Sequence, residues 1–100
     1  MTTVATKEIT AQNTFSDAVR LNGYFNISIS GTFAATVTVQ RSPDNSSWFD
    51  VNTYTSPIEA TGYEPEFLWY RVGVKTSEFT SGTVNVRVGA SSAQMNTLGA

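Results

Sequence analysis

The sequence predicts an all-β fold, a single antiparallel β-sandwich of seven or eight strands with Greek-key or jelly-roll-like wiring. Three observations support this class. Short segments alternate apolar and polar residues with a period of two, which is typical of half-buried strands. Clusters of turn residues separate these segments, and no segment shows the i, i+3, i+4, i+7 pattern of a helix. The 100 residues suffice for one such domain.

The clearest strand pair is expected between residues 36 and 54, in the stretch that begins TVTVQRSPDNSSWFDV. Val37 and Val39 alternate with polar residues, which indicates a half-buried strand. Trp48 and Phe49 then open the return strand with the largest apolar surfaces of this region.

The residues between these two strands have the composition of a tight turn. Pro43 presets φ for the first turn position, while Asp44 and Asn45 can bond their own backbone and tolerate left-handed geometry. The oxygens of this loop, with Asp50 beyond it, also raise the alternative of a Ca²⁺ site. The spacing is not that of an EF-hand, so a plain hairpin turn is favoured.

Further strands are expected, in chain order, at residues 2–9, 15–21, 24–30, 67–75 and 82–88. Asn22 and Gly23 predict a turn, because both residues accept positive φ. Residues 56–65 are predicted to form an acidic loop, since two prolines and a glycine interrupt them. The domain organisation expected is an N-terminal arm or edge strand (1–12), the sandwich (13–88) and an extended polar tail (89–100).

The strand predicted at residues 67–75 is apolar on both faces near its start. One face is expected to carry Leu68, Tyr70, Val72 and Val74, and the other Phe67, Trp69, Arg71, Gly73 and Lys75. A strand with one wet face would not place Trp69 between Leu68 and Tyr70. Either a loop of the same chain covers Trp69, or this side chain meets a neighbouring subunit.

The composition excludes several function classes. The chain has no Cys and no His, which removes disulfides, thiol nucleophiles, imidazole bases and ordinary zinc sites. Its six basic and eight acidic residues form no basic cluster for nucleic acid. No apolar run approaches the roughly 20 residues that span a bilayer, and the N-terminus lacks the apolar centre of a secretory signal. Synthesis in a cytoplasm, with no cofactor, no nucleic acid and no membrane partner, is expected.

Candidate catalytic groups are few. Glu59, Glu64 and Glu66 could supply the carboxylate pair of a glycoside hydrolase, but no His or Lys lies near them in sequence. A solvated acidic loop is therefore favoured. The Thr80-Ser81-Gly82 run lacks the Gly two residues before the Ser that a nucleophile elbow needs. We expect a protein that is not an enzyme.

Exposed aromatic and arginine side chains are the candidate contact residues. Aromatic rings that face solvent can stack on sugars and are also enriched at protein interfaces. Arginines on the polar faces of two predicted strands could form ion pairs between subunits. The candidates are Tyr24, Tyr54, Tyr63, Trp69, Arg71 and Arg87.

The order of features between Gly31 and Val88 carries a family resemblance. The first piece is the hairpin VTVQRSPDNSSWFDV, followed by a Thr-rich strand (NTYT) and a Gly-Tyr-Glu-Pro-Glu approach to the aromatic strand FLWYRVGVKT. The last piece is the closing hairpin FTSGTVNVRV. This chain resembles a group of small β-sandwich proteins of tailed-phage virions, which include head decoration (cement) proteins and related head and tail accessory proteins. The resemblance covers somewhat over half of the chain.

Two motifs of this group match the chain residue by residue. The "RS-x-D-x-(G/S)-x-W" hairpin is matched by Arg41, Ser42, Asp44 and Trp48, and the "YTSGTVNVRL" hairpin by Thr80, Ser81, Gly82, Thr83 and Val84. The chain departs from the pattern at Pro43, where an aromatic often stands, and at Asn45-Ser46, where Gly-Gly often stands. These motifs are structural, so they indicate a fold family better than a function.

The resemblance implies a virion structural protein, with a capsid decoration protein as the first hypothesis. Such a protein binds the outside of the head lattice and stabilises it. Its partners would be the major capsid protein and copies of itself, with a trimer favoured, and its location the virion. The alternative is a carbohydrate-binding, tail or fibre accessory module. Coplanar exposed aromatics beside a groove would favour a glycan, and aromatics packed against another subunit would favour assembly.

Overall fold

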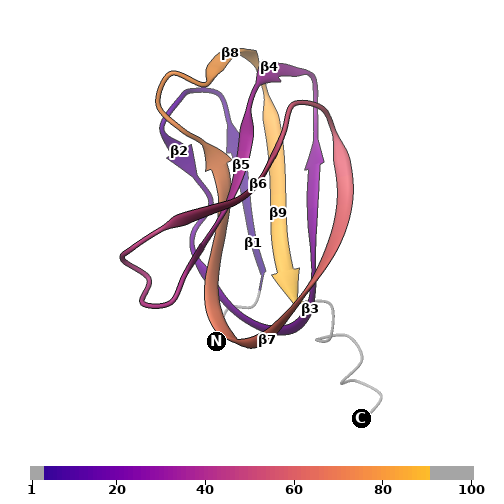
Figure 1. Cartoon of the computed structure of the whole chain (residues 1–100). Helices are drawn as coiled ribbons and strands as arrows, with labels where there is room; N and C mark the ends of the chain where they lie inside the picture. The colour runs from indigo at the N-terminus through magenta and orange to yellow at the C-terminus, as the bar shows by residue number, and fades with distance from the viewer. Residues whose placement is uncertain (1–3, 91–100) are drawn as a thin grey trace.

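The computed structural model describes residues 4–90, and this part of the chain contains strands and connecting turns but no helix (Figure 1). All its strand pairs are antiparallel. The strands are β1 Val4–Ile9, β2 Thr14–Phe15, β3 Val19–Ser30, β4 Phe33–Ala35, β5 Val37–Ser42, β6 Phe49–Tyr54, β7 Ile58–Val74, β8 Phe79–Gly82 and β9 Val84–Ala90. The all-β antiparallel sandwich is thereby confirmed. Three very short strands, β2, β4 and β8, are assigned among the nine.

Two long strands, β3 and β7, connect the layers of the sandwich. The main sheet has the order β1-β9-β3-β7-β5-β6, with β2 also paired to β7, while β4 and β8 form a separate small sheet. The second half of β3 pairs with β9 and with the first half of β7. The second half of β7 pairs with β5. Both strands bend between these halves, so that β1 and β9 lie in one layer and β5 and β6 in the other (Figure 1).

The bend corrects the prediction of a turn at Asn22 and Gly23. The two residues lie inside β3, where the register with β7 shifts between Leu21 and Gly23. Gly23 does adopt a positive φ of 88°, but the chain continues in the same strand instead of reversing. The Asn22 side chain donates a hydrogen bond to the carbonyl oxygen of Pro65 at 3.3 Å. A left-handed glycine thus forms a β-bulge here, which bends a strand without ending it.

The prediction of a loop at residues 56–65 is also wrong, because β7 begins at Ile58. The two prolines do not conflict with the strand. Pro57 lies just before its first residue, and Pro65 lies at the bend, where the regular ladder with β3 is interrupted. Proline is tolerated in strands at such positions because no ladder hydrogen bond is lost.

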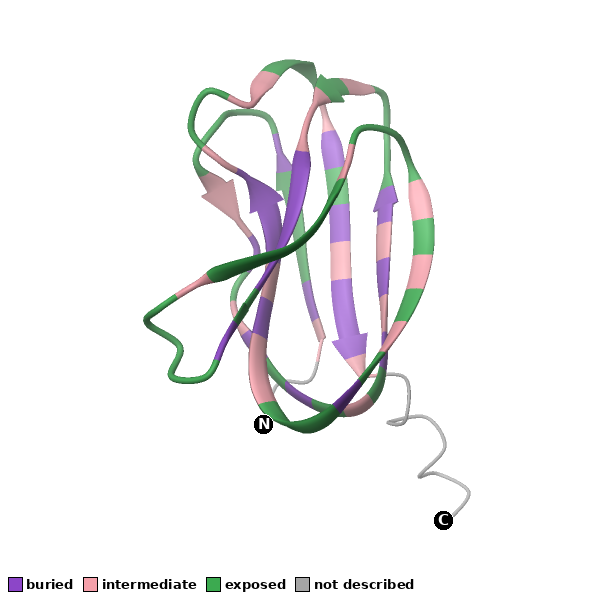
Figure 2. Ribbon diagram, in the orientation of Figure 1, coloured by how far each residue is buried: buried purple, intermediate pink, exposed green. Residues whose placement is uncertain are grey.

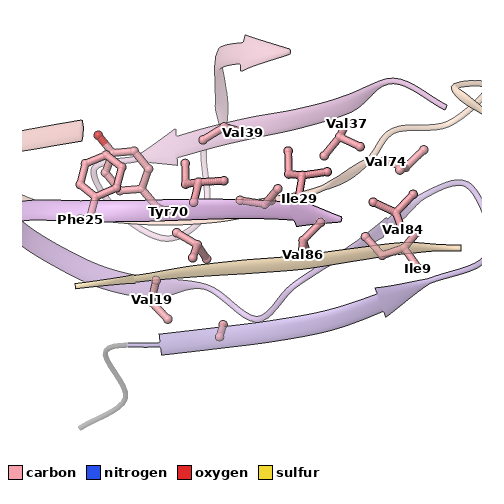
Figure 3. Packing of buried hydrophobic residues seen from close by; sticks show 14 of the residues in the cluster. Ile9, Val19, Phe25, Ile29, Val37, Val39, Tyr70, Val74, Val84 and Val86 are labelled. Carbon is pink, nitrogen blue, oxygen red and sulfur yellow. The ribbon is translucent and has the colours of Figure 1, made fainter. Parts of the chain in front are cut away.

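The core lies between the two layers, and the side chains of β5 face those of β9 and β3 across it (Figure 3). The rings of Phe25 and Tyr70 pack against each other at one end, with centroids 4.7 Å apart. Val37, Val39, Tyr70, Val72 and Val74 point inward as predicted, whereas Leu68 is only half-buried. The prediction that β5 is half-buried is wrong, because Thr38 and Gln40 on its other face are buried as well. The buried hydrophobic residues are Ala5, Ile9, Val19, Leu21, Phe25, Ile27, Ile29, Val37, Val39, Tyr70, Val72, Val74, Val84, Val86 and Val88.

The turn between β5 and β6 has the predicted chemistry. The Asp44 carboxylate accepts hydrogen bonds from the backbone N–H groups of Ser46 and Ser47 at 2.9 and 2.8 Å, and from the Ser42 hydroxyl at 2.9 Å. These bonds lower the pKa of Asp44 below its usual value, and the bond from Ser47 has the largest effect. Asn45 adopts a positive φ of 61°. The hairpin-turn interpretation is confirmed.

Replacing Ile29 by Ala is expected to destabilise the sandwich by about 2–5 kcal/mol, because the side chain is 1% exposed and its removal leaves a cavity between the layers. The matched control is Val51→Ala on β6, a strand that is exposed along most of its length (Figure 2). Val51 is 48% exposed, and this change should cost less than about 1 kcal/mol. Urea unfolding of both variants measures the difference, and equal losses would contradict the assigned core.

Candidate functional site

Exposed aromatic rings lie on both sides of the bend of β3 and β7. Tyr24 and Tyr63 face each other across the β3–β7 ladder, with ring centroids 4.8 Å apart and planes tilted by 57°. They are 63% and 58% exposed. Phe67, at the end of the bend in β7, is 58% exposed, and the Arg20 guanidinium lies 4.7 Å from its ring centroid. We call Tyr24, Tyr63 and Phe67 the aromatic corner.

A second aromatic arrangement lies on the outer face of the layer that contains β5 and the second half of β7. The Arg71 guanidinium lies over two rings, 4.4 Å from the centroid of Phe15 and 4.3 Å from that of Trp48. Its Nε donates a hydrogen bond to Oε1 of Gln40 at 2.9 Å. We call Phe15, Arg71 and Trp48 the arginine stack. Burial beneath the two rings lowers the pKa of Arg71 from its usual value.

The local structure of β2 explains how Phe15 reaches Arg71. β2 pairs with the end of β7, and the Ser16 backbone N–H donates to the carbonyl oxygen of Val72 at 2.9 Å. A Cβ atom at Gly73 would lie only 2.5 Å from Cα of Phe15, so this close approach requires glycine. β2 therefore lies beside the end of β7, at Gly73 and Val74, and the two alternatives for Trp69 stay open.

Polar side chains continue the arginine stack toward β6. Gln40 donates through Nε2 to the Asp50 carboxylate at 2.9 Å, and Lys75 forms an ion pair with the same carboxylate at 2.6 Å. The hydrogen bond from Lys75 is the main cause that lowers the pKa of Asp50, and it raises the pKa of Lys75 in turn. Because both partners are substantially exposed, this ion pair adds little stability.

An open hollow of about 500 Å³ lies beside Arg71. It is lined by side chains from the segment before β2, from β5, from β7 and from the turn after β7. These residues are Asn13, Phe15, Gln40, Arg71, Lys75, Thr76 and Glu78.

Glu64 is not part of a solvated acidic loop, contrary to the prediction. It is 3% exposed and lies on the inner face of the bend, where its Oε1 accepts hydrogen bonds from the Tyr70 hydroxyl at 2.7 Å and from Arg41 at 3.2 Å. The period of two turns its neighbours Tyr63 and Pro65 outward and Glu64 inward. The carboxylate is thus used to join β7 to β5 inside the sandwich. We call Arg41, Glu64 and Tyr70 the buried triad after its buried carboxylate and phenol; the Arg41 side chain itself is 48% exposed.

The six predicted contact residues do not form one site. Tyr24 and Tyr63 lie together in the aromatic corner. Tyr54 is half-buried against the core, and its hydroxyl accepts a hydrogen bond from Asn52 at 3.1 Å. Arg87 lies on β9, in the layer of β1 and β9, and donates a hydrogen bond to Oδ1 of Asn26 at 2.7 Å.

Trp69 and Arg71 share the outer face of β7. Trp69 is half-buried, opposite Arg20 on one side and Ser42 on the other. Arg71 does not project freely, since the arginine stack holds it.

Three residues of these arrangements were missed from the sequence. Phe67 could have been found from the sequence, because it lies two residues after Pro65 and on the same outward face of the strand as Trp69. Phe15 and Trp48 have none, because they are far from Arg71 in the chain and meet it only through strand pairing.

Comparisons of the chain with protein-family models, with curated proteins and with solved structures find no match in any of the three. The fold is that of an antiparallel β-sandwich. Within residues 4–90, no helix is long and apolar enough to cross a membrane, and no three His, Cys, Asp or Glu side chains are grouped to hold a metal ion. The resemblance to phage virion proteins stays a prediction.

The buried triad predicts a specific pH dependence. Burial, and then the hydrogen bond to Glu64, raise the pKa of Tyr70 to about 12, from 10.0 for an unperturbed tyrosine. The stability that the protonated hydroxyl contributes is therefore complete below pH 10 and is lost as the pH rises toward 12. Tyr70→Phe should cost about 1 kcal/mol at pH 8, by loss of one hydrogen bond, and this difference should shrink above pH 10. Chemical unfolding of both proteins from pH 8 to 12 measures it, and a constant difference would contradict the assignment.

Proposed function

We propose that this protein is a virion structural protein, a capsid decoration protein that binds the outside of the phage head lattice through the aromatic corner. The observation that carries the proposal is the exposure of Tyr24, Tyr63 and Phe67 at one bend of the sandwich. The family resemblance supplies the virion as the setting. The structure supplies a surface that suits a protein partner.

The aromatic corner has the properties of an interface anchor. Tyrosine and phenylalanine bury a large area for few rotatable bonds, and they are enriched at the centres of protein interfaces. Two long paired strands carry the rings, so little backbone entropy is lost when a partner binds. The chain has only 14% charged residues, so little charge must be desolvated when its surface meets another protein.

The carbohydrate-binding alternative expects a flat aromatic platform beside a groove. The Tyr24 and Tyr63 planes are instead tilted by 57°, so the two rings do not form such a platform. This geometry supports the choice of a protein partner over a glycan.

The experiment that tests the function is light scattering of the purified protein, alone and with purified phage particles that lack it. The proposal expects saturable binding to the particles, and the stoichiometry then gives the number of copies on the lattice. An oligomer of the free protein, with a trimer expected, would fit symmetric attachment. A monomer that ignores particles but binds a glycan array would contradict the proposal and favour the carbohydrate-binding module.

Replacing both Tyr24 and Tyr63 by Ser should weaken binding to such particles at least tenfold, because loss of interface aromatics typically costs more than about 1.4 kcal/mol. The matched control is Phe49→Ser, which removes a ring that is 60% exposed on β6, a strand that pairs with β5 and not with β3 or β7. The control should bind normally. A control that binds as poorly as the double variant, or a double variant that binds normally, would place the contact elsewhere.

A further inference from the structure

Arg71 is a half-buried cation without a counter-ion in the described part of the chain. The ion pairs within residues 4–90 are Arg41–Glu64 and Lys75–Asp50, and neither includes Arg71. All eight acidic residues of the sequence lie in that range, so each of their carboxylates was available to pair with it. A partly desolvated charge without an opposite charge is costly, and folded proteins rarely keep one without compensation.

The surroundings of Arg71 hold its guanidinium in one orientation. The rings of Phe15 and Trp48 both lie against it, and Gln40 accepts the bond from its Nε. No hydrogen bond from its two terminal nitrogens is formed within residues 4–90. These nitrogens carry four N–H groups in a planar fork, which matches the two oxygens of a carboxylate. The side-chain entropy that such a contact normally costs has already been lost on folding.

We propose that Arg71 is a carboxylate-binding site, and that its ligand is an Asp or Glu side chain of the protein to which the sandwich docks. The inference deepens the proposed function and rests on it for the identity of that protein. The site comprises the arginine stack, Gln40 and the hollow beside them. An arginine with aromatic neighbours is a frequent energetic centre of protein interfaces.

The charges around the hollow favour a carboxylate over a phosphate group. The lining carries the positive Arg71 and Lys75 and the negative Glu78, and Lys75 is paired with Asp50, which lies outside the lining. The acidic side chains of Asp50 and Glu78 repel any anion, but they repel a phosphate, which brings two negative charges on one group, more strongly than a carboxylate group, which brings one to the guanidinium. A carboxylate delivered by a docked protein also has a high effective concentration.

Tryptophan fluorescence can measure carboxylate binding directly. The chain has two tryptophans, so the variant Trp69→Phe leaves Trp48, which is stacked on Arg71, as the single reporter. We would titrate this variant with sodium glutarate at constant ionic strength, with sodium chloride as the reference. The proposal expects a saturable change in Trp48 emission with glutarate only. An identical, non-saturating response to both salts would overturn it.

Variants of Arg71 test whether this side chain binds a carboxylate or only packs against its neighbours. In the Trp69→Phe background, Arg71→Lys keeps the charge but loses the fork, and should raise the half-saturation concentration several-fold. Arg71→Gln should abolish saturation. The matched control is Arg87→Gln, an arginine on the other layer, which should leave the titration unchanged. Circular dichroism confirms that each variant is folded. Saturation that persists in Arg71→Gln would show that Arg71 is not the receptor.

The particle assay keeps the two proposals distinguishable. Saturable glutarate binding by a protein that ignores phage particles would contradict the proposed function and leave the carboxylate site standing. Particle binding that is unchanged in Arg71→Gln, together with no glutarate response, would overturn the carboxylate site and leave the proposed function standing. Arg71→Gln is expected to weaken particle binding at least tenfold, as removal of a buried charged hydrogen-bond partner usually does.

Discussion

The pairing of β3 with β7 continues around one bend, and the rest of the structure depends on it. Because both strands pass from one layer to the other, β1 and β9 are held to one half of the pair and β5 and β6 to the other. The bulge at Asn22 and Gly23 permits the bend, and Pro65 lies opposite it. Without this bend the two layers would be one flat sheet with no enclosed core.

Successive side chains along the bend point to opposite sides of it, and the two sides have different roles. Tyr63 points outward to Tyr24, while the next residue, Glu64, points inward to Tyr70 and Arg41. The buried triad thus ties β7 to β5 directly beneath the exposed rings. A buried carboxylate with two donors is costly to disrupt, so the bend that carries the aromatic corner is a rigid support for it.

The sequence predicts those features that depend only on residue type and on near neighbours in the chain. The inward faces of the strands and the capped turn at Asp44 both follow from the period of two and from residue type. The buried state of Glu64 did not, because it requires knowing that residues 58–64 pair with β3. The arginine stack was missed for the same reason, since Phe15 and Trp48 come from distant segments. The conformation of Gly23 was predicted, but its use in a bulge depends on the partner strand.

The central claim is that the bend presents the binding surface, and amide hydrogen exchange of the free and particle-bound protein tests it most directly. Exchange reports local opening and solvent access segment by segment. The account predicts slower exchange on binding at residues 22–26 and 62–68, which contain the aromatic corner. Exchange in β1, at the far edge of the sheet, should not change. Protection confined to β1 and β9, with the bend unchanged, would contradict it.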